Sequence, residues 1–147
     1  MTDPVHTDKT HPMPPAAQAI VDRHMEAMMQ ELETADFQSL GVVMGQRLAE
    51  LKAAHPSVGD VRSIGLFGIV ELVRDRKTLE PLAPFNGTSP EMQALGKFFR
   101  EEGLYTFLRW NTFFTNPPLC ITEAEMAEAF AIIDKGLYIT DRAIAGA

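Results

Sequence analysis

The sequence predicts an α+β fold in which helices pack on a small, mainly antiparallel sheet. In four segments apolar residues recur three and four positions apart, as on a helix with one buried face. The runs between them are short and rich in β-branched and aromatic residues, as in strands. The resulting order is helix, helix, strand, loop, helix, strand, strand, helix. This order lacks the regular alternation that is typical of a parallel sheet.

The first half of the chain is predicted to hold an arm, two helices and a long strand. Residues 1–15 contain four prolines and no periodicity, so we expect an irregular arm. Residues 16–147 are expected to form a single domain. Helices are predicted over residues 16–33 and from residue 37 to Pro56, where proline ends the second helix. Residues 61–73 are predicted to be one strand, with Gly65 and Gly68 marking a bulge or a close backbone contact.

The second half is predicted to hold a loop, a helix, two short strands and a final helix. Two prolines and mixed charges between residues 74 and 87 indicate a surface loop. Ser89 and Pro90 have the residue types of a helix cap and a first helical position. Strands are predicted over about 104–109 and 112–115, and Thr122 with Glu125 forms a capping box for the last helix. The residues predicted to face inward are Met92, Leu95, Phe99, Met126, Phe130, Ile133 and Leu137.

Composition narrows the possible partners. The chain has 147 residues, is 46% hydrophobic and carries a formal charge of −7. A negative charge disfavours nucleic acid and anionic membrane surfaces as partners. The start of the chain has no secretory pattern, and no apolar run is long enough to span a membrane. Cys120 is the only cysteine, which favours a reducing, cytoplasmic location, and its apolar neighbours predict that it is a small buried residue.

No motif for complete catalytic chemistry is present. The sequence has no glycine-rich phosphate loop, no serine elbow and no paired metal-ligand spacing. We therefore expect no metal site and no catalytic residue. Solvated histidines are the expected interpretation of His6, His11 and His24, and His55 is expected to interact with the end of a helix.

Arg109 is the candidate binding residue. It lies in an apolar, β-prone run and shares a strand face with Tyr105 and Phe107. A guanidinium cannot be buried there without an anionic partner. Three roles are open: binding an acidic ligand, pairing with a glutamate of this chain, or occupying an exposed edge position.

Several separated blocks resemble one family in the same order. The blocks are Thr7 through His11-Pro12, Val58 to Leu66, Glu71 to Asp75, Gly103-Leu104, Pro117 to Leu119, and the capping box at Thr122. Together they resemble the C-terminal small domain of class III, fold-type-I aminotransferases, which depend on pyridoxal phosphate. The resemblance is strongest to members that pair taurine or other ω-amino donors with pyruvate.

The resemblance implies roles for two residues. Arg109 would bind the acidic end of an amino or keto acid, a role suited to a planar, bidentate donor. Many relatives carry this arginine two positions earlier, where Phe107 stands here; a shift of two keeps the same strand face. Thr7 would contact the phosphate of pyridoxal phosphate across the interface of a homodimer.

The resemblance also implies that this chain alone is inactive. In the family a preceding large domain supplies the Schiff-base lysine and binds the cofactor. The lysines of this chain lie in none of the matching contexts. The leading expectation is therefore a domain of an aminotransferase that uses an ω-amino or amino-sulfonate donor and a keto acid such as pyruvate. The alternative is a non-catalytic binding or dimerisation module that retains the fold.

Overall fold

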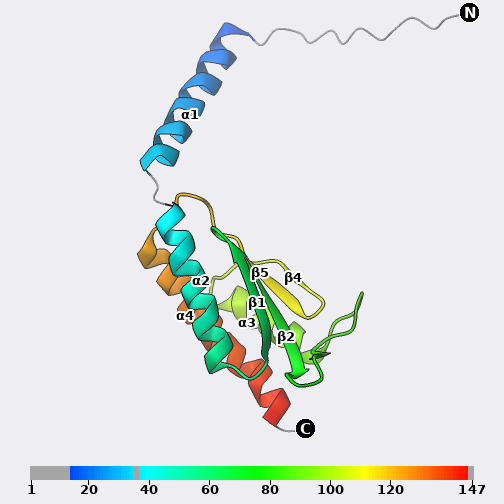
Figure 1. The fold of residues 1–147 in the computed structure, drawn as a ribbon. Coiled ribbons are helices and arrows are strands. Elements are labelled where there is room, and N and C mark those ends of the chain that lie inside the picture. The colour runs from blue at the N-terminus through cyan, green and yellow to red at the C-terminus, as the bar shows by residue number, and fades with distance from the viewer. Residues whose placement is uncertain (1–13, 35–36, 146–147) are drawn as a thin grey trace, which may run out of the picture. The chain divides into compact units, whose positions relative to one another are not determined.

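The computed structural model describes residues 14–34 and 37–145, which fall into two units (Figure 1). The helix α1 (Pro15–Thr34) belongs to the first unit, and the chain from residue 35 onward forms the second. On α1 the apolar residues Ile20, Val21, Met25 and Met29 are exposed. Every described helix is too short or too polar to cross a membrane.

Three helices belong to the second unit. They are α2 (Phe37–Ala54), α3 (Pro90–Glu101) and α4 (Glu123–Ala145). The predicted caps are present, since the Met92 N–H donates to the Ser89 hydroxyl at 3.3 Å. At the start of α4, the Thr122 N–H donates to the Glu125 carboxylate at 2.8 Å and the Glu125 N–H donates to the Thr122 hydroxyl at 3.2 Å. Local polar groups therefore define both helix starts.

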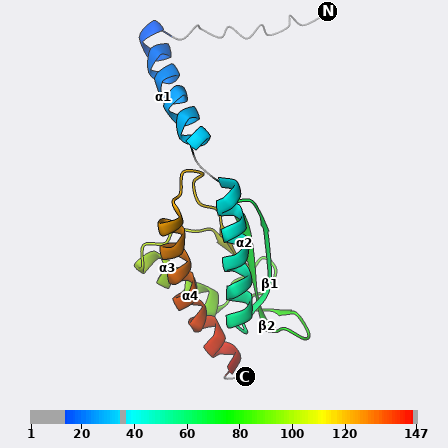
Figure 2. The same cartoon turned by 60° about the vertical axis from the view of Figure 1, so that its left-hand side comes forward.

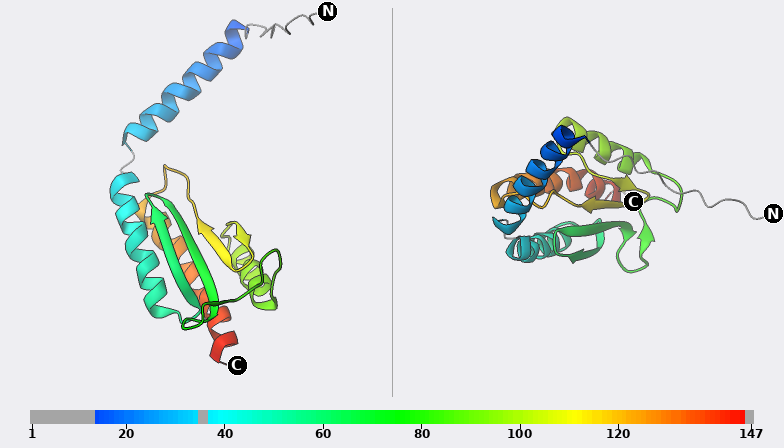
Figure 3. Two further views of the ribbon diagram at one scale, coloured as in Figure 1. Left: turned by 45° about the vertical axis from the view of Figure 1, so that its right-hand side comes forward. Right: turned by 90° about the horizontal axis from the view of Figure 1, so that it is seen from above.

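The sheet is antiparallel. Its strands are β1 (Val58–Ile64), β2 (Phe67–Asp75), β5 (Thr112–Thr115) and β4 (Leu108–Arg109), in the order β1-β2-β5-β4. The short strand β3 (Glu80–Pro81) pairs with β2 outside this path. α2 lies along the β1–β2 hairpin and α3 lies beside α4 (Figures 2 and 3). The predicted α+β class with a small antiparallel sheet is confirmed.

The long strand predicted over residues 61–73 is wrong, because the chain reverses within it. β1 and β2 form a hairpin whose two turn residues are Gly65 and Leu66. Gly65 has φ of +54°, a value that glycine adopts without strain. At Gly68 a Cβ would lie 2.2 Å from the Thr115 hydroxyl and 2.8 Å from a Leu48 methyl group, so side chains and not another backbone lie close to this glycine. Apolar residues on both sides of the turn hid the hairpin from the sequence pattern.

One core lies between the sheet and the helices. Side chains on every second position of β2 and β5 are buried in it, and the helical residues predicted to face inward join them. The largest fully buried residues include Met44, Leu48, Val70, Leu72, Leu95, Phe99, Phe113, Met126 and Leu137. The intervening positions of β2 and β5 point to the opposite face of the sheet, where Phe67 and Phe114 lie.

Candidate functional site

A cavity is formed where the segments before and after the β4–β5 hairpin meet the helices. Its volume is about 580 Å³. Most of the residues around it are apolar, and they come from the loops at 104–107 and 116–121, from β2 and β5, and from α2 and α4. The lining residues are Met44, Phe67, Leu104, Tyr105, Thr106, Phe107, Phe114, Thr115, Asn116, Pro117, Pro118, Ile121, Met126, Ala129, Phe130 and Ile133.

Backbone bonds and ring contacts hold the cavity wall. The Phe114 N–H donates to the Phe107 carbonyl at 3.1 Å, and the Thr106 hydroxyl donates to the Phe114 carbonyl. The ring of Phe114 lies 5.5 Å from that of Phe107 and 5.7 Å from that of Phe67, measured between centroids. These three rings form an aromatic cluster at one end of the sheet, positioned by the pairing of β2, β5 and β4.

Arg109 lies on the edge strand of the sheet and is exposed. Its guanidinium carbon lies 4.3 Å from the centroid of the Trp110 ring. Within the described part of the chain, no acidic side chain forms an ion pair with it, so the predicted alternative of a glutamate partner is not observed. The exposed edge position is observed, and it leaves the guanidinium N–H groups available to a ligand.

Arg109 does not line the cavity, but it lies on the same sheet as the aromatic cluster. It pairs with Thr112, and Phe114 follows two residues later on the same face of β5. Two residues span about 7 Å along a strand. A cationic group and an apolar surface are therefore close enough for one small molecule with an acidic end to contact both.

Other arginines of the sheet do have acidic partners: Arg74 of β2 lies 3.4 Å from Glu91, and Arg62 of β1 has two such partners. Its guanidinium lies 3.2 Å from Glu71 and 3.4 Å from Asp60. A hydrogen bond from Lys52 holds the pKa of Asp60 below its usual value. Arg62 is thus neutralised by its neighbours, whereas Arg109 is not.

Two predictions about single residues have different outcomes. Thr7 lies outside the described residues, and its role stays a prediction. The predicted burial of Cys120 is wrong, because the residue is exposed. It occupies a turn in which the Ile121 N–H donates to the Pro118 carbonyl at 3.0 Å, and Ile121 rather than Cys120 lines the cavity.

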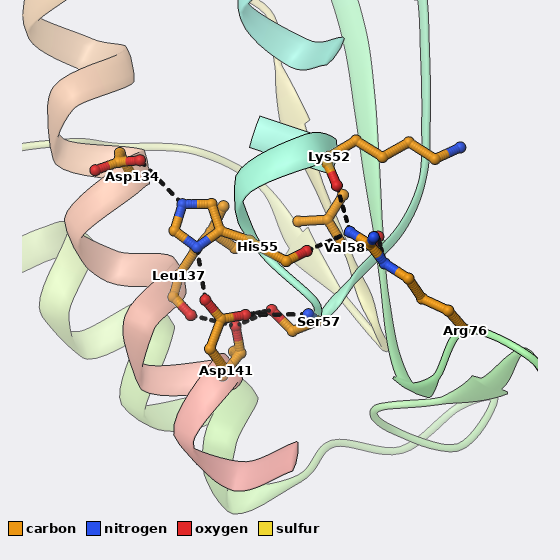
Figure 4. A network of polar contacts seen from close by, with 9 residues as sticks. Lys52, His55, Ser57, Val58, Arg76, Asp134, Leu137 and Asp141 are labelled. Atoms are coloured by element: carbon orange, nitrogen blue, oxygen red, sulfur yellow. Dashed lines mark hydrogen bonds and ion pairs between the residues drawn. The ribbon is translucent and has the colours of Figure 1, made fainter. Parts of the chain in front are cut away.

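A buried polar network around His55 was missed by the sequence analysis (Figure 4). The imidazole is fully buried, and its two nitrogens lie 2.6 Å from Asp141 and 3.0 Å from Asp134 of α4. Asp141 also accepts from the Ser57 N–H at 3.0 Å and from the Ser57 hydroxyl at 2.6 Å. The signal in the sequence was the spacing of seven between the two aspartates, which places both on one helix face with buried Leu137.

This network ties α2 to α4 and lacks the geometry of a nucleophilic site. The Ser57 hydroxyl donates to Asp141 and does not contact His55, so the imidazole is not placed to take its proton as in a serine–histidine pair. Arg76 holds the segment around His55 by donating to the carbonyls of Lys52, His55 and Val58 (Figure 4). None of His55, Ser57 and Asp141 lines the cavity.

The described residues do not fit a covalently bound aldehyde cofactor. A Schiff base needs a lysine that is held in a site, and none of the described lysines lines the cavity. Lys52 is paired with Asp60 at 3.0 Å, and Lys97 is paired with Glu101 at 3.7 Å. The fold and site therefore define an α+β domain with an exposed arginine on the edge strand of its sheet and an apolar cavity, but with no lysine of the described ranges in that cavity to form a Schiff base.

Comparison with known proteins identifies the family. The chain matches the family described as aminotransferase class-III over residues 3–137. It is 40% identical over 109 residues to the taurine–pyruvate aminotransferase of Bilophila wadsworthia, covering 67% of this chain and 23% of that protein. It is 32% identical over 94 residues to the isoleucine 2-epimerase of Lentilactobacillus buchneri, covering 64% of this chain and 20% of the epimerase.

Solved structures agree with these sequence matches. The taurine:2-oxoglutarate aminotransferase of Bifidobacterium kashiwanohense, solved with PLP and glutamate, superposes with a TM-score of 0.68 at 27% identity, covering 72% of this chain and 24% of that one. A Bacillus anthracis aminotransferase gives a TM-score of 0.69 at 27% identity, covering 84% of this chain and 28% of that one.

The chain therefore belongs to the class III aminotransferase family, as the sequence blocks indicated. It spans about a quarter of the length of the relatives it matches.

Proposed function

We propose that this chain is the C-terminal domain of a pyridoxal-phosphate-dependent class III aminotransferase. The reaction would move an amino group between an ω-amino or amino-sulfonate donor and a keto acid such as pyruvate. The match to a taurine–pyruvate aminotransferase supports this choice of substrates. Family membership alone does not select it, because the relatives include an epimerase.

One observation carries the proposal: Arg109 is exposed and has no acidic partner among the described residues, and it pairs with Thr112 of β5, two residues before Phe114 of the aromatic cluster. A guanidinium recognises carboxylate and sulfonate through its planar N–H edge. The role we propose for Arg109 is to bind the acidic end of the substrate. Phe107, Phe114 and Phe67 would exclude water beside it.

The remaining parts of the reaction would come from outside the described residues. The cofactor and its Schiff-base lysine would belong to a large domain, which supplies the carbonyl chemistry. The proposal includes a cytoplasmic homodimer in which Thr7 contacts the cofactor phosphate of the partner subunit. It also implies that the present 147 residues do not catalyse transamination alone.

Arg109→Ala, made in an enzyme that joins this chain to its large domain, tests the proposal. The KM for the acidic amino donor should rise about tenfold or more, because a charge-assisted bidentate contact is lost. Arg62→Ala is the matched control, since Arg62 is on the same sheet but is already paired with Glu71 and Asp60. Equal KM values for Arg109→Ala and the wild-type enzyme would remove the assignment.

A further inference from the structure

The turn that follows Arg109 is built from an unusual residue. β4 and β5 are joined by a two-residue turn, Trp110 and Asn111, and Trp110 has φ of +56°. In the β1–β2 hairpin the equivalent first position is occupied by Gly65, with φ of +54°. A bulky side chain at positive φ is strained and persists only where its surroundings fix it. Backbone strain of this kind clusters at functional sites.

Asn111 fixes the backbone of this turn from the sheet side. It is buried, its side-chain amide donates to the Leu72 carbonyl at 2.9 Å, and its own carbonyl accepts from the Leu72 N–H at 2.8 Å. Two hydrogen bonds to the central strand β2 thus hold the turn in place. The strained residue Trp110 projects from a rigid base and not from a mobile loop.

A second turn supports the indole. The Gly87 N–H donates to the Pro84 carbonyl at 2.9 Å, and Asn86 within this turn has φ of +58°. The turn presents Phe85, whose ring centroid lies 4.3 Å from that of Trp110 at an interplanar angle of 49°. Asn86 and Trp110, two of the described residues with positive φ, therefore lie at or next to the contact between the Phe85 and Trp110 rings.

We propose that Trp110 is a positioning residue that orients the Arg109 guanidinium for an acidic ligand. The guanidinium carbon lies 4.3 Å from the centroid of the indole ring, and the Phe85 ring is tilted by 49° against the indole; we call these three contacting groups the stack. A guanidinium that stacks on a ring keeps its N–H edge free, and that edge is the part that binds a carboxylate or sulfonate in a bidentate manner. The inference rests on the proposed function for the identity of the ligand, but the stack itself does not.

The stack should lower the mobility of a long, exposed side chain. An arginine on an edge strand samples many rotamers unless a partner restrains it. Holding it in one orientation reduces the entropy that is lost when the acid binds. Replacing the ring should therefore weaken binding of the acidic substrate while leaving the chemical steps unchanged.

NMR of the 147-residue chain tests the stack without any substrate. In Trp110→Gly the positive φ is retained without strain, so the hairpin is expected to fold. The heteronuclear NOE of the Arg109 Nε–H group should fall by about half or more, because the side chain gains fast motion. Trp110→Phe, which keeps an aromatic face, should restore most of it. An unchanged NOE in Trp110→Gly would overturn the positioning role.

Fluorescence provides a second test that leaves the ring in place. Trp110 is the only tryptophan of the chain, so the emission reports on the surroundings of this one indole, which Arg109 and Phe85 contact. Arg109→Ala should shift or intensify the emission, because the cation no longer lies over the indole. Identical spectra for Arg109→Ala and the wild-type chain would also contradict the stack.

Kinetics of the joined enzyme separate this inference from the proposed function. With taurine as donor, Trp110→Gly should raise KM about three- to fivefold with kcat nearly unchanged, as expected for loss of one cation–π contact. If Arg109→Ala left KM unchanged, the proposed function would fail whatever the spectra showed. If Arg109→Ala raised KM while Trp110→Gly changed neither NOE nor KM, only the positioning role would be wrong.

Discussion

At the scale of single residues, the two aspartates that contact His55 differ sharply in exposure. The Asp141 side chain is 12% exposed and has three partners, whereas the Asp134 side chain is 46% exposed. We predict that Asp141→Ala lowers the free energy of unfolding by about 2–4 kcal/mol, because it leaves buried donors of His55 and Ser57 unpaired. Urea unfolding of the 147-residue chain measures the loss.

Asp134→Ala is the matched variant, since it removes a carboxylate from the other nitrogen of the same ring. Its cost should be below about 1 kcal/mol, because water can replace an exposed carboxylate. Similar losses for the two variants would show that burial of the acceptor does not determine the strength of this network.

Residue-level features differed in how far the sequence could predict them. The sequence could identify Arg109 as a candidate because a charged residue in an apolar strand requires an anionic partner or solvent. Its contact with Trp110 depends on a turn with positive φ, which the sequence pattern does not predict. Cys120 was misplaced because apolar neighbours suggest burial, while the turn before α4 directs Ile121 inward instead. The partners of His55 lie 79 and 86 residues away, so sequence neighbours gave no indication of them.

At the scale of elements, Gly136 tests the packing of α4 on α3. A Cβ at Gly136 would lie 2.6 Å from the Phe99 ring, which is buried, and 3.0 Å from Leu95. We predict that Gly136→Ala lowers the free energy of unfolding by about 1–2 kcal/mol, because overpacking outweighs the gain in helix propensity. Thermal or urea unfolding measures the change.

Gly45 of α2 provides the comparison. A Cβ there would lie 3.5 Å from the Ser63 hydroxyl, an ordinary contact. Gly45→Ala should therefore stabilise the chain by about 0.5–1 kcal/mol through helix propensity alone. A stabilising effect of Gly136→Ala would mean that α3 and α4 pack less closely than described.

The start of α3 gives a pH-dependent prediction. The Glu91 backbone N–H and the Ser89 hydroxyl donate to the Glu91 carboxylate, and these bonds lower its pKa from the usual 4.5. A lowered folded-state pKa means that this stabilisation is present above pH 4.5 and is lost as the pH falls through the folded-state value. Glu91→Gln should cost about 0.5–1 kcal/mol at neutral pH and almost nothing at strongly acidic pH.

Unfolding curves of wild type and Glu91→Gln at several pH values check this dependence. Glu101→Gln, at the other end of α3, is the control, because an acid there does not meet free helix N–H groups. A cost for Glu91→Gln that stays constant down to strongly acidic pH would contradict the capping interaction.

Elements with a strong period were predictable and turns were not. Helices α2, α3 and α4 appear near their expected boundaries because each carries a buried stripe or a polar cap. α1 also appears near its expected boundaries, but the buried face expected from its apolar spacing is wrong for Val21 and Met25, which are exposed. The sequence pattern predicts one strand where the β1–β2 hairpin lies, because the turn residues Gly65 and Leu66 have apolar residues on both sides. Of the strand expected over 104–109, only Leu108 and Arg109 join the sheet as β4. Residues 104–107 line the cavity instead.

At the scale of the whole molecule, the absence of a lysine from the cavity gives a spectroscopic prediction. After addition of pyridoxal phosphate and desalting, the 147-residue chain should retain no visible internal aldimine band, because the described lysines are surface groups or are paired with acids. A denatured sample controls for nonspecific Schiff bases. A stoichiometric band that survives desalting only in the folded chain would contradict the proposal that the Schiff-base lysine belongs to the large domain and not to this chain.

The family could be recognised from ordered blocks of sequence, but the reaction cannot be read from them. Val58 to Leu66 and Glu71 to Asp75 lie in the β1–β2 hairpin, so these two blocks build the sheet. Under the proposed function, substrate choice would depend on a few groups on the sheet face and its edge, above all Arg109 and the nearby rings. Those groups would contact a ligand once the chain is joined to its large domain.

The central claim is that Arg109 binds the acid of the substrate. The most direct test compares two amino donors, one with a sulfonate or carboxylate and one of similar size without an acid, in the joined enzyme and its Arg109→Ala variant. The account predicts that kcat/KM falls about tenfold or more for the acidic donor and changes less than about twofold for the neutral donor. Equal changes for both donors, or no change for either, would contradict it.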